Sequence, residues 1–303
     1  MIKSFFLTGI AAASLVASPW ATAQSIDTLK KIKEASTITM GVREASGATS
    51  YSLGGGEYAG FHVDVCRNVI ADIEKQLGLK KLTVRYQSVT PQNRIPLVQN
   101  GTVDLECGTT TNNAARQKDV AFAPTLYIEE VRVATKTKSG ITGLAQLANR
   151  TVSATSGTTA VQLIRKHERA TGVDFKEIFA RDNSEGFLLL ENDRADAFVA
   201  DGQILATMIS QSRQSASYVV LKEILSVEPI AIMLPKGDAP FKRMVDESIV
   251  KMAKNGDIAK LYDKWFNQPI PPNNVTVGLP ASPMTKAAWV EPSDKPLEDY
   301  VKK

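Results

Sequence analysis

The feature that most constrains the fold is an alternation of short β-branched runs with helical segments. Residues 37–42 (Thr-Ile-Thr-Met-Gly-Val) predict a strand. Residues 61–78 then repeat apolar positions at helical spacing and end at a glycine, which predicts a helix with a C-cap. The same order returns at 151–155 and 160–170. Short strands joined by helices indicate an α/β protein with largely parallel sheets.

The alternation occurs twice along the chain, which indicates two units. The 303 residues are too many for one ordinary core. A second set of strands and helices begins near residue 131 and includes a strand at 197–200. Two more helices are predicted at 239–254 and 257–266, and the proline-interrupted tail after residue 272 is predicted to wrap the surface. No linker is evident, so we expect strand crossings to join the units.

The N-terminus has the pattern of a secretory signal peptide. Lys3 supplies a positive charge, an apolar run extends from Phe5 to Val16, and Ala21-Thr22-Ala23 gives an A-x-A cleavage pattern. We therefore expect residues 1–23 to be removed and the mature chain to begin at Gln24. A membrane anchor is the alternative, but the run is shorter than the roughly 20 residues that span a bilayer.

Charge and cysteine content exclude several classes of function. The formal net charge is only +4, and the basic residues are scattered, so a nucleic-acid-binding surface is not indicated. The two cysteines, Cys66 and Cys107, either form one disulfide in an exported protein or remain buried thiols. Without clustered histidines they are too few for a zinc site. We expect neither a metal nor a cofactor.

Three arginines lie where predicted strands end or helices begin, which is where ligands bind in open α/β sheets. They are Arg43, Arg94 and Arg116. An arginine pairs with a carboxylate through two parallel hydrogen bonds, so arginines that converge on one cleft suit a ligand with more than one carboxylate. A single arginine is more often a solvated surface charge.

Hydroxyl groups and one acid complete the candidate site. Thr109 and Thr111 lie in one loop, and Thr155 and Thr158 lie in another. These loops suit a carboxylate, but helix capping is the simpler explanation, and both can hold together. Asp201 ends a predicted strand, where it either receives an ammonium group or caps the next helix; the local sequence favours neither.

Seven segments, in the same order, resemble the glutamate/aspartate periplasmic binding proteins of bacterial ABC importers, within solute-binding protein family 3. The Gln-Asn-Arg-Ile-Pro and Glu-Cys-Gly segments are typical of the branch that binds acidic ligands, and the resemblance spans nearly all of the mature chain. The segments are residues 41–44, 92–97, 99–108, 110–113, 116–117, 156–159 and 264–266.

The resemblance implies a type II periplasmic binding protein fold, in which the ligand binds in a cleft between two lobes. Lobe 1 would comprise residues 24–126 and 229–303, and lobe 2 would comprise residues 131–225. The hinge crossings would lie at 126–130 and 225–229.

The resemblance also implies roles for the candidate residues. Arg116 would hold the α-carboxylate of the ligand, helped by Thr111 and Thr158, and Asp201 would hold its ammonium group.

The side-chain carboxylate of the ligand would meet Arg43 and Arg94, with Thr109 and Thr155 nearby. An amide could not compensate for two buried arginines, because an unpaired buried charge costs on the order of 3–5 kcal/mol. This pair would therefore separate glutamate and aspartate from their amides.

The sequence departs from the family pattern at Pro91, Thr109 and Asn183, where related proteins carry serine, serine and, in enterobacterial relatives, histidine. Both distal arginines remain. A Cys66–Cys107 bridge would lie within lobe 1, whereas related proteins place the partner of the second cysteine near the second hinge.

The resemblance implies a monomeric periplasmic protein that captures L-glutamate or L-aspartate by hinge closure and delivers it to the membrane permease of an ABC importer. A periplasmic enzyme on the same fold, of the cyclohexadienyl or arogenate dehydratase type, is one alternative. It would need a placed acid or base, and the only histidines are His62 and His167. A receptor that reports ligand to a membrane partner is the other alternative.

Overall fold

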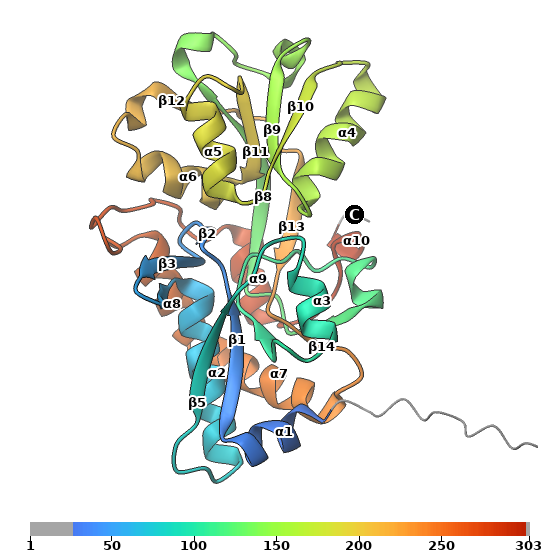
Figure 1. Cartoon of the computed structure of the whole chain (residues 1–303), viewed down its shortest axis with the longest axis vertical. Helices are drawn as coiled ribbons and strands as arrows, with labels where there is room; N and C mark the ends of the chain where they lie inside the picture. Colours follow the sequence, from blue (N-terminus) through green and yellow to red (C-terminus); the bar gives the residue numbers. More distant parts are fainter. Residues whose placement is uncertain (1–26, 301–303) are drawn as a thin grey trace, which may run out of the picture.

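The computed structural model describes residues 27–300, which form two lobes stacked along the long axis of the molecule (Figure 1). Each lobe is built on its own sheet, so the prediction of a two-lobed α/β protein is confirmed. The predicted signal peptide, residues 1–23, lies outside the described residues. Within the described range, no helix is long and apolar enough to cross a membrane.

The first lobe contains a five-stranded sheet in the order β5-β1-β6-β14-β7. Its strands are β1 (Thr37–Val42), β5 (Thr83–Ser88), β6 (Leu105–Glu106), β7 (Val120–Phe122) and β14 (Met233–Pro235). Its helices are α1 (Thr28–Ala35), α2 (Phe61–Gln76), α3 (Arg94–Gln99), α7 (Ala239–Lys254) and α8 (Asp257–Phe266).

The second lobe contains a six-stranded sheet in which β10-β9-β11-β8-β12 are neighbours and β13 pairs with β8. Its strands are β8 (Tyr127–Lys136), β9 (Thr151–Thr155), β10 (Lys176–Ala180), β11 (Ala197–Asp201), β12 (Tyr218–Val220) and β13 (Ser226–Ile230). Its helices are α4 (Thr159–Thr171), α5 (Asn183–Glu191) and α6 (Gly202–Gln211).

Both sheets are mixed, so the prediction of largely parallel sheets is wrong. β1 is parallel to β5 and β6, and β9 is parallel to β10 and β11. β14 is antiparallel to both of its neighbours, and β8 is antiparallel to β11, β12 and β13. β8 carries the chain into the second lobe and β13 carries it back beside β8, so this pair is antiparallel.

The chain passes between the two sheets twice. β7 belongs to the first sheet and the next strand, β8, to the second; β13 belongs to the second sheet and β14 to the first. In the β8–β13 pair, Glu129 lies opposite Glu228. Residues 127–130 lie on β8, and residues 226–229 lie on β13.

Local signals fix the ends of several helices. The side chain of Asp238 accepts the N–H of Phe241 at 3.1 Å and caps α7. Gly256, with φ of 76°, takes the left-handed conformation between α7 and α8. The helices predicted at 239–254 and 257–266 are therefore confirmed.

Three parts of the fold were not predicted. β10 and α5 lie between the helix predicted at 160–170 and the strand predicted at 197–200. The glycine-rich stretch after β1 forms a small antiparallel sheet of β2 (Ala45–Ser46), β3 (Ser50–Gly54) and β4 (Glu57–Ala59). The tail contains α9 (Pro283–Val290) and α10 (Leu297–Tyr300), and α9 packs on β8 and α7.

A disulfide joins Cys66 to Cys107, so the predicted pair is oxidised in the structure. Cys66 lies on α2 and Cys107 directly follows β6, and both are buried in the core of the first lobe. The bridge therefore fastens a helix to the strand end that leads into the candidate site.

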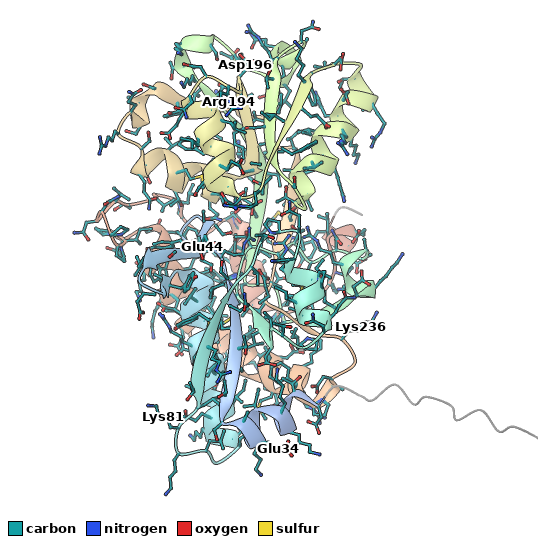
Figure 2. The ribbon with its side chains drawn as sticks, viewed as in Figure 1. Glu34, Glu44, Lys81, Arg194, Asp196 and Lys236 are labelled. Carbon is teal, nitrogen blue, oxygen red and sulfur yellow. A yellow bond between two sulfur atoms is a disulfide. The ribbon has the colours of Figure 1, made fainter. Side chains whose placement is uncertain are left out.

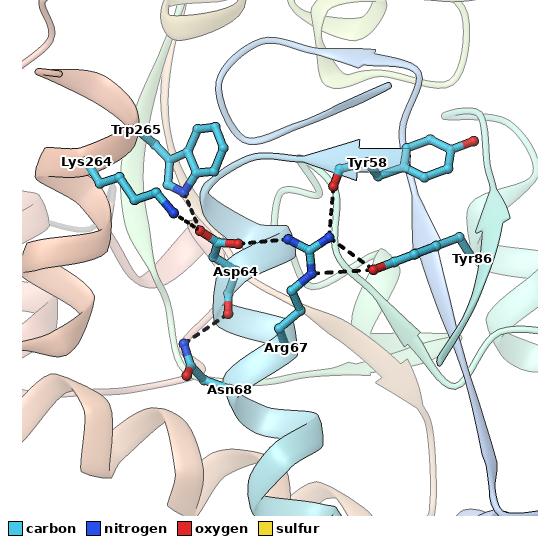
Figure 3. A network of polar contacts seen from close by, with 7 residues as sticks. All are labelled: Tyr58, Asp64, Arg67, Asn68, Tyr86, Lys264 and Trp265. Carbon is cyan, nitrogen blue, oxygen red and sulfur yellow. Dashed lines mark hydrogen bonds and ion pairs between the residues drawn. The ribbon is translucent and has the colours of Figure 1, made fainter. Parts of the chain in front are cut away.

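A polar network joins α2 to α8 and to the neighbouring strands (Figure 3). Asp64 accepts hydrogen bonds from Arg67 at 3.0 Å, from Lys264 at 2.6 Å and from the indole N–H of Trp265 at 2.9 Å. Arg67 also donates to the hydroxyl of Tyr86 and to the backbone of β4. Residues 264–266, one of the segments that carry the family resemblance, thus have a structural role.

Elsewhere, charged side chains are spread over both lobes, from Glu34 and Lys81 at one end to Arg194 and Asp196 at the other (Figure 2).

Candidate functional site

A pocket between the lobes gathers seven of the eight side chains predicted to bind ligand. The space left between these closely packed side chains is small. The seven are Arg43, Arg94, Thr109, Thr111, Arg116, Thr158 and Asp201. The eighth, Thr155, is buried and donates a hydrogen bond at 2.8 Å to Asn183, which lines the pocket.

Arg43 follows β1 and is almost fully buried, with 3% of its surface exposed. Burial, reinforced by the charge of Arg94, lowers the pKa of Arg43 to about 10, so the side chain stays charged at neutral pH. The site is packed closely around it. A Cβ atom on Gly108 would lie 2.3 Å from Oε1 of Glu106 and 2.6 Å from Cγ of Arg43, so only glycine fits there.

Arg94 begins α3 and is also buried, with 2% exposed. One amino group donates to the carbonyl of Thr109 at 2.8 Å, while Nε has no partner among the described residues. Burial lowers the pKa of Arg94, with the charge of Glu106 opposing it. A buried guanidinium with an unused donor is suited to an anionic partner.

Arg116 lies in a 3₁₀ turn (Arg116–Lys118) and spans the cleft. Its two amino groups donate to the carbonyl of Thr111 at 2.9 Å and, across the cleft, to the carbonyl of Gly157 at 3.5 Å. Burial, together with the charge of Arg94, lowers the pKa of Arg116 to about 9. It remains the third cation of the pocket at neutral pH.

Asp201 stands at the N-cap position of α6, but its side chain makes no capping hydrogen bond. The carboxylate of Asp201 is thus left to face the pocket. Burial, followed by the charge of Glu228, raises the pKa of Asp201 to about 7.

Several threonine hydroxyl groups at the pocket use their only proton in hydrogen bonds to other groups of the protein. Thr111 donates to Oε2 of Glu228 at 2.6 Å, and Thr158 donates to the carbonyl of Thr155 at 2.6 Å. Because a hydroxyl group has one proton and two lone pairs, these side chains present acceptors to the pocket.

Glu228 lies next to the candidate site and was missed by sequence reasoning. It is fully buried on β13, and its Oε2 also accepts the hydroxyl of Thr159 in the second lobe, at 2.9 Å. One carboxylate oxygen at the crossing therefore holds a threonine from each side of the cleft. An acid inside the apolar run Val-Glu-Pro-Ile was the available signal, since an unpaired carboxylate is rarely buried.

Neither histidine lines the pocket. His62 is buried on α2, where Nδ1 donates to the carbonyl of Gly108 at 2.7 Å. Burial lowers the pKa of His62 to about 4, so it is neutral at physiological pH. Among the described residues, no group of three His, Cys, Asp or Glu side chains could hold a metal ion.

Known proteins share both the sequence pattern and the fold. The family described as bacterial extracellular solute-binding proteins, family 3, matches residues 38–268. The L-glutamate/L-aspartate-binding protein of Pseudomonas aeruginosa is 40% identical over 97% of this chain and 98% of its own length. The glutamate/aspartate import solute-binding protein of Escherichia coli K12 is 36% identical over 89% of each chain.

Solved structures of other proteins have a similar fold. A substrate-binding protein of an ABC uptake transporter from Streptococcus pneumoniae, with bound histidine, superposes with a TM-score of 0.70. The alignment covers 80% of this chain and 97% of that one, at 22% identity.

Proposed function

Because the chain belongs to the bacterial extracellular solute-binding proteins, family 3, we propose that it binds L-glutamate or L-aspartate and supplies it to the permease of an ABC importer. The observation that carries this proposal is the meeting of Arg43, Arg94 and Arg116 with Asp201 in one interlobe pocket. Three cations and one anion complement a ligand with two carboxylates and one ammonium group. The relatives named for glutamate and aspartate support the same ligand class.

Each charged group of the ligand has a partner in this arrangement. Arg43 and Arg94 would hold the side-chain carboxylate, and Arg116 would hold the α-carboxylate. Asp201 would receive the ammonium group. Thr111 suits the ammonium group better than a carboxylate, because its hydroxyl proton is committed to Glu228 and its lone pairs remain.

The remaining pocket threonines would act beside these charges. Thr158, whose hydroxyl and backbone N–H both donate to the carbonyl of Thr155, would shape the α-carboxylate end of the pocket at the start of α4. Thr109 and Thr155 would shape the wall near the side-chain carboxylate.

Capture would proceed by hinge closure. Lobe 1 (24–126 and 229–303) and lobe 2 (131–225) would rotate about crossings at 126–130 and 225–229, burying the ligand. Charge-assisted hydrogen bonds in a water-poor cleft would supply the binding energy. The protein would be exported by its signal peptide and act as a periplasmic monomer. The dehydratase alternative is not favoured, because the relatives are named as solute-binding proteins.

Calorimetry with matched ligands tests the proposal. The mature protein is unfolded and refolded to remove bound ligand and is then titrated with L-Glu, L-Asp, L-Gln and L-Asn. We expect at least one of the acids to bind with micromolar or tighter affinity and the isosteric amides to show no binding. Equal affinity for acids and amides would mean that Arg43 and Arg94 do not contact the ligand side chain.

A further inference from the structure

The turn between β2 and β3 of the first lobe lies against helices α5 and α6 of the second lobe (Figure 1). Three backbone groups in or next to this turn form hydrogen bonds with side chains of the second lobe. Asn183 donates to the carbonyl of Ala45 at 2.8 Å, and Gln203 donates to the carbonyl of Ser46 at 3.2 Å. The N–H of Ala48 donates to the hydroxyl of Thr207 at 3.2 Å.

These contacts are buried on both sides. Ser46 and Ala48 are fully buried, and Gln203 and Thr207 are each 3% exposed. Opening the cleft would separate the backbone groups from these partners. Buried groups that lose hydrogen bonds are costly until water replaces the partner, so the contacts favour the closed arrangement.

Gly47 permits the close approach. It has φ of 59°, which favours glycine, and a Cβ atom there would lie 2.3 Å from Oε1 of Gln203 and 3.0 Å from Cα of Ile204. The first atom lies at the end of the Gln203 side chain, which is hydrogen-bonded to the carbonyl of Ser46, and the second belongs to the backbone of α6. A side chain at position 47 would therefore push the two lobes apart.

Most of the contact is separate from the ligand pocket. Gln203, Thr207 and residues 45–48 do not line it, whereas Asn183 and Ile204 do. The contact therefore depends on the relative position of the lobes more than on which small ligand fills the pocket.

We propose that residues 45–48, together with Asn183, Gln203 and Thr207, form a closure clamp that sets how slowly bound ligand is released. The proposal rests on the proposed function, since release presupposes a ligand captured between the lobes. Ligand enters the open form, where the clamp is apart, so the clamp governs the dissociation rate and leaves the association rate nearly unchanged.

The test compares two glycines in the two turns of the β2-β3-β4 sheet. Gly47→Ala places a methyl group against α6, while Gly55→Ala is the matched control, because Gly55 has φ of 62° and no atom within 4 Å of the added Cβ. Both variants incur similar backbone strain, but only the first obstructs closure. Thr207→Val gives an independent variant that removes the partner of Ala48 and keeps the side-chain shape.

Dissociation and association rates of L-glutamate are measured by stopped-flow fluorescence on the full mature protein. Gly47→Ala and Thr207→Val are expected to dissociate ligand about tenfold faster or more, with Gly55→Ala within about twofold of the wild type. Rates in Gly47→Ala and Thr207→Val equal to those of the wild type would overturn the clamp. Melting temperatures show whether all variants are folded.

The two proposals can fail separately. If the wild type does not bind L-glutamate, the ligand assignment fails, and the comparison is repeated with the standard amino acid that gives the largest thermal shift. The clamp is supported if the variants release that amino acid faster than the wild type and the Gly55→Ala control, and refuted if they do not.

Discussion

Burying Arg43 and Arg94 side by side is unfavourable unless an anion joins them. Desolvation and mutual repulsion both oppose this placement, and Glu106 offsets them only in part. A ligand carboxylate would supply the missing negative charge together with acceptors for the free N–H groups. The two arginines that destabilise the ligand-free site are thus those expected to make it selective for acidic ligands.

Replacing Arg94 by lysine should weaken L-glutamate binding by about a hundredfold, because lysine cannot form the forked contact and truncating a buried charged partner costs roughly 2–5 kcal/mol. Arg85 is exposed on the neighbouring strand β5, so Arg85→Lys is the matched control and should bind normally. Calorimetry measures both. Unchanged affinity in a folded Arg94→Lys protein would place the side-chain carboxylate elsewhere.

The affinity for L-glutamate should rise with pH between about 6 and 8. The pKa of Asp201 is about 7 in the ligand-free site, raised by burial and then by Glu228, and lowered by Arg94, Arg43 and Arg116. Below that pH, Asp201 must lose a proton to receive the ammonium group, so affinity should fall by up to about tenfold per pH unit. Calorimetry in buffers of different ionisation enthalpy counts the released protons.

The same measurement has two informative variants. Glu228→Gln keeps an acceptor for Thr111 and Thr159 but removes the charge that raises the pKa of Asp201, so the pH midpoint should move down. Asp201→Asn should bind weakly at every pH with no dependence in this range. A pH profile of the wild type that is flat would exclude Asp201 as the ammonium partner.

At the scale of elements, the site is assembled from the ends of secondary structures. Arg43 follows β1, Arg94 begins α3, and Asp201 joins β11 to α6. Parallel strands such as β1 and β6, or β9 and β11, bring their carboxyl ends to one edge, so distant residues meet there. The disulfide fixes one such edge by holding the end of β6 to α2.

Reducing the disulfide should lower the free energy of unfolding by about 2–4 kcal/mol, because the bridge closes a loop in the unfolded chain. The bonded cysteines are 41 residues apart. Urea unfolding with and without reductant measures the change, and mass spectrometry verifies reduction. The double variant Cys66→Ala, Cys107→Ala should not respond to reductant. Identical unfolding curves for oxidised and fully reduced wild type would contradict this prediction.

Elements with strong local signals could be predicted from the sequence, and others could not. α7 and α8 were predicted because apolar periodicity and Gly256 mark them. β10 and α5 were missed: β10 is short and has no clear alternation of exposed and buried residues, and α5 carries Leu188, Leu189 and Leu190 in a row, which obscures the helical period. Parallel pairing was overpredicted, because strands such as β8 and β13 are far apart in the sequence and become antiparallel neighbours only when the chain returns between the lobes.

At the scale of the whole molecule, the fold places one pocket where two separately built lobes face each other. Thr111 and Thr159 both reach Glu228, and Arg116 reaches Gly157, so pocket geometry depends on the relative position of the lobes. Any motion about the β8–β13 crossings would change all of these contacts together.

Adding L-glutamate should make the protein more compact, because the ligand would bridge the lobes and favour closure. Small-angle X-ray scattering should show a smaller radius of gyration with L-glutamate, while L-glutamine at the same concentration should leave it unchanged. Compaction by neither ligand, with binding shown by calorimetry, would contradict capture by hinge closure.

The sequence by itself determined the α/β class, the two units, most helices and the identity of the charged strand-end residues, because each of these depends on local periodicity or on residues close in the chain. Only the tertiary structure decided which hydroxyl protons are committed, that Asp201 does not cap α6, and that Glu228 and Gly47 matter. Those features depend on contacts between residues from different elements, often in different lobes, and such contacts exist only after the chain has folded.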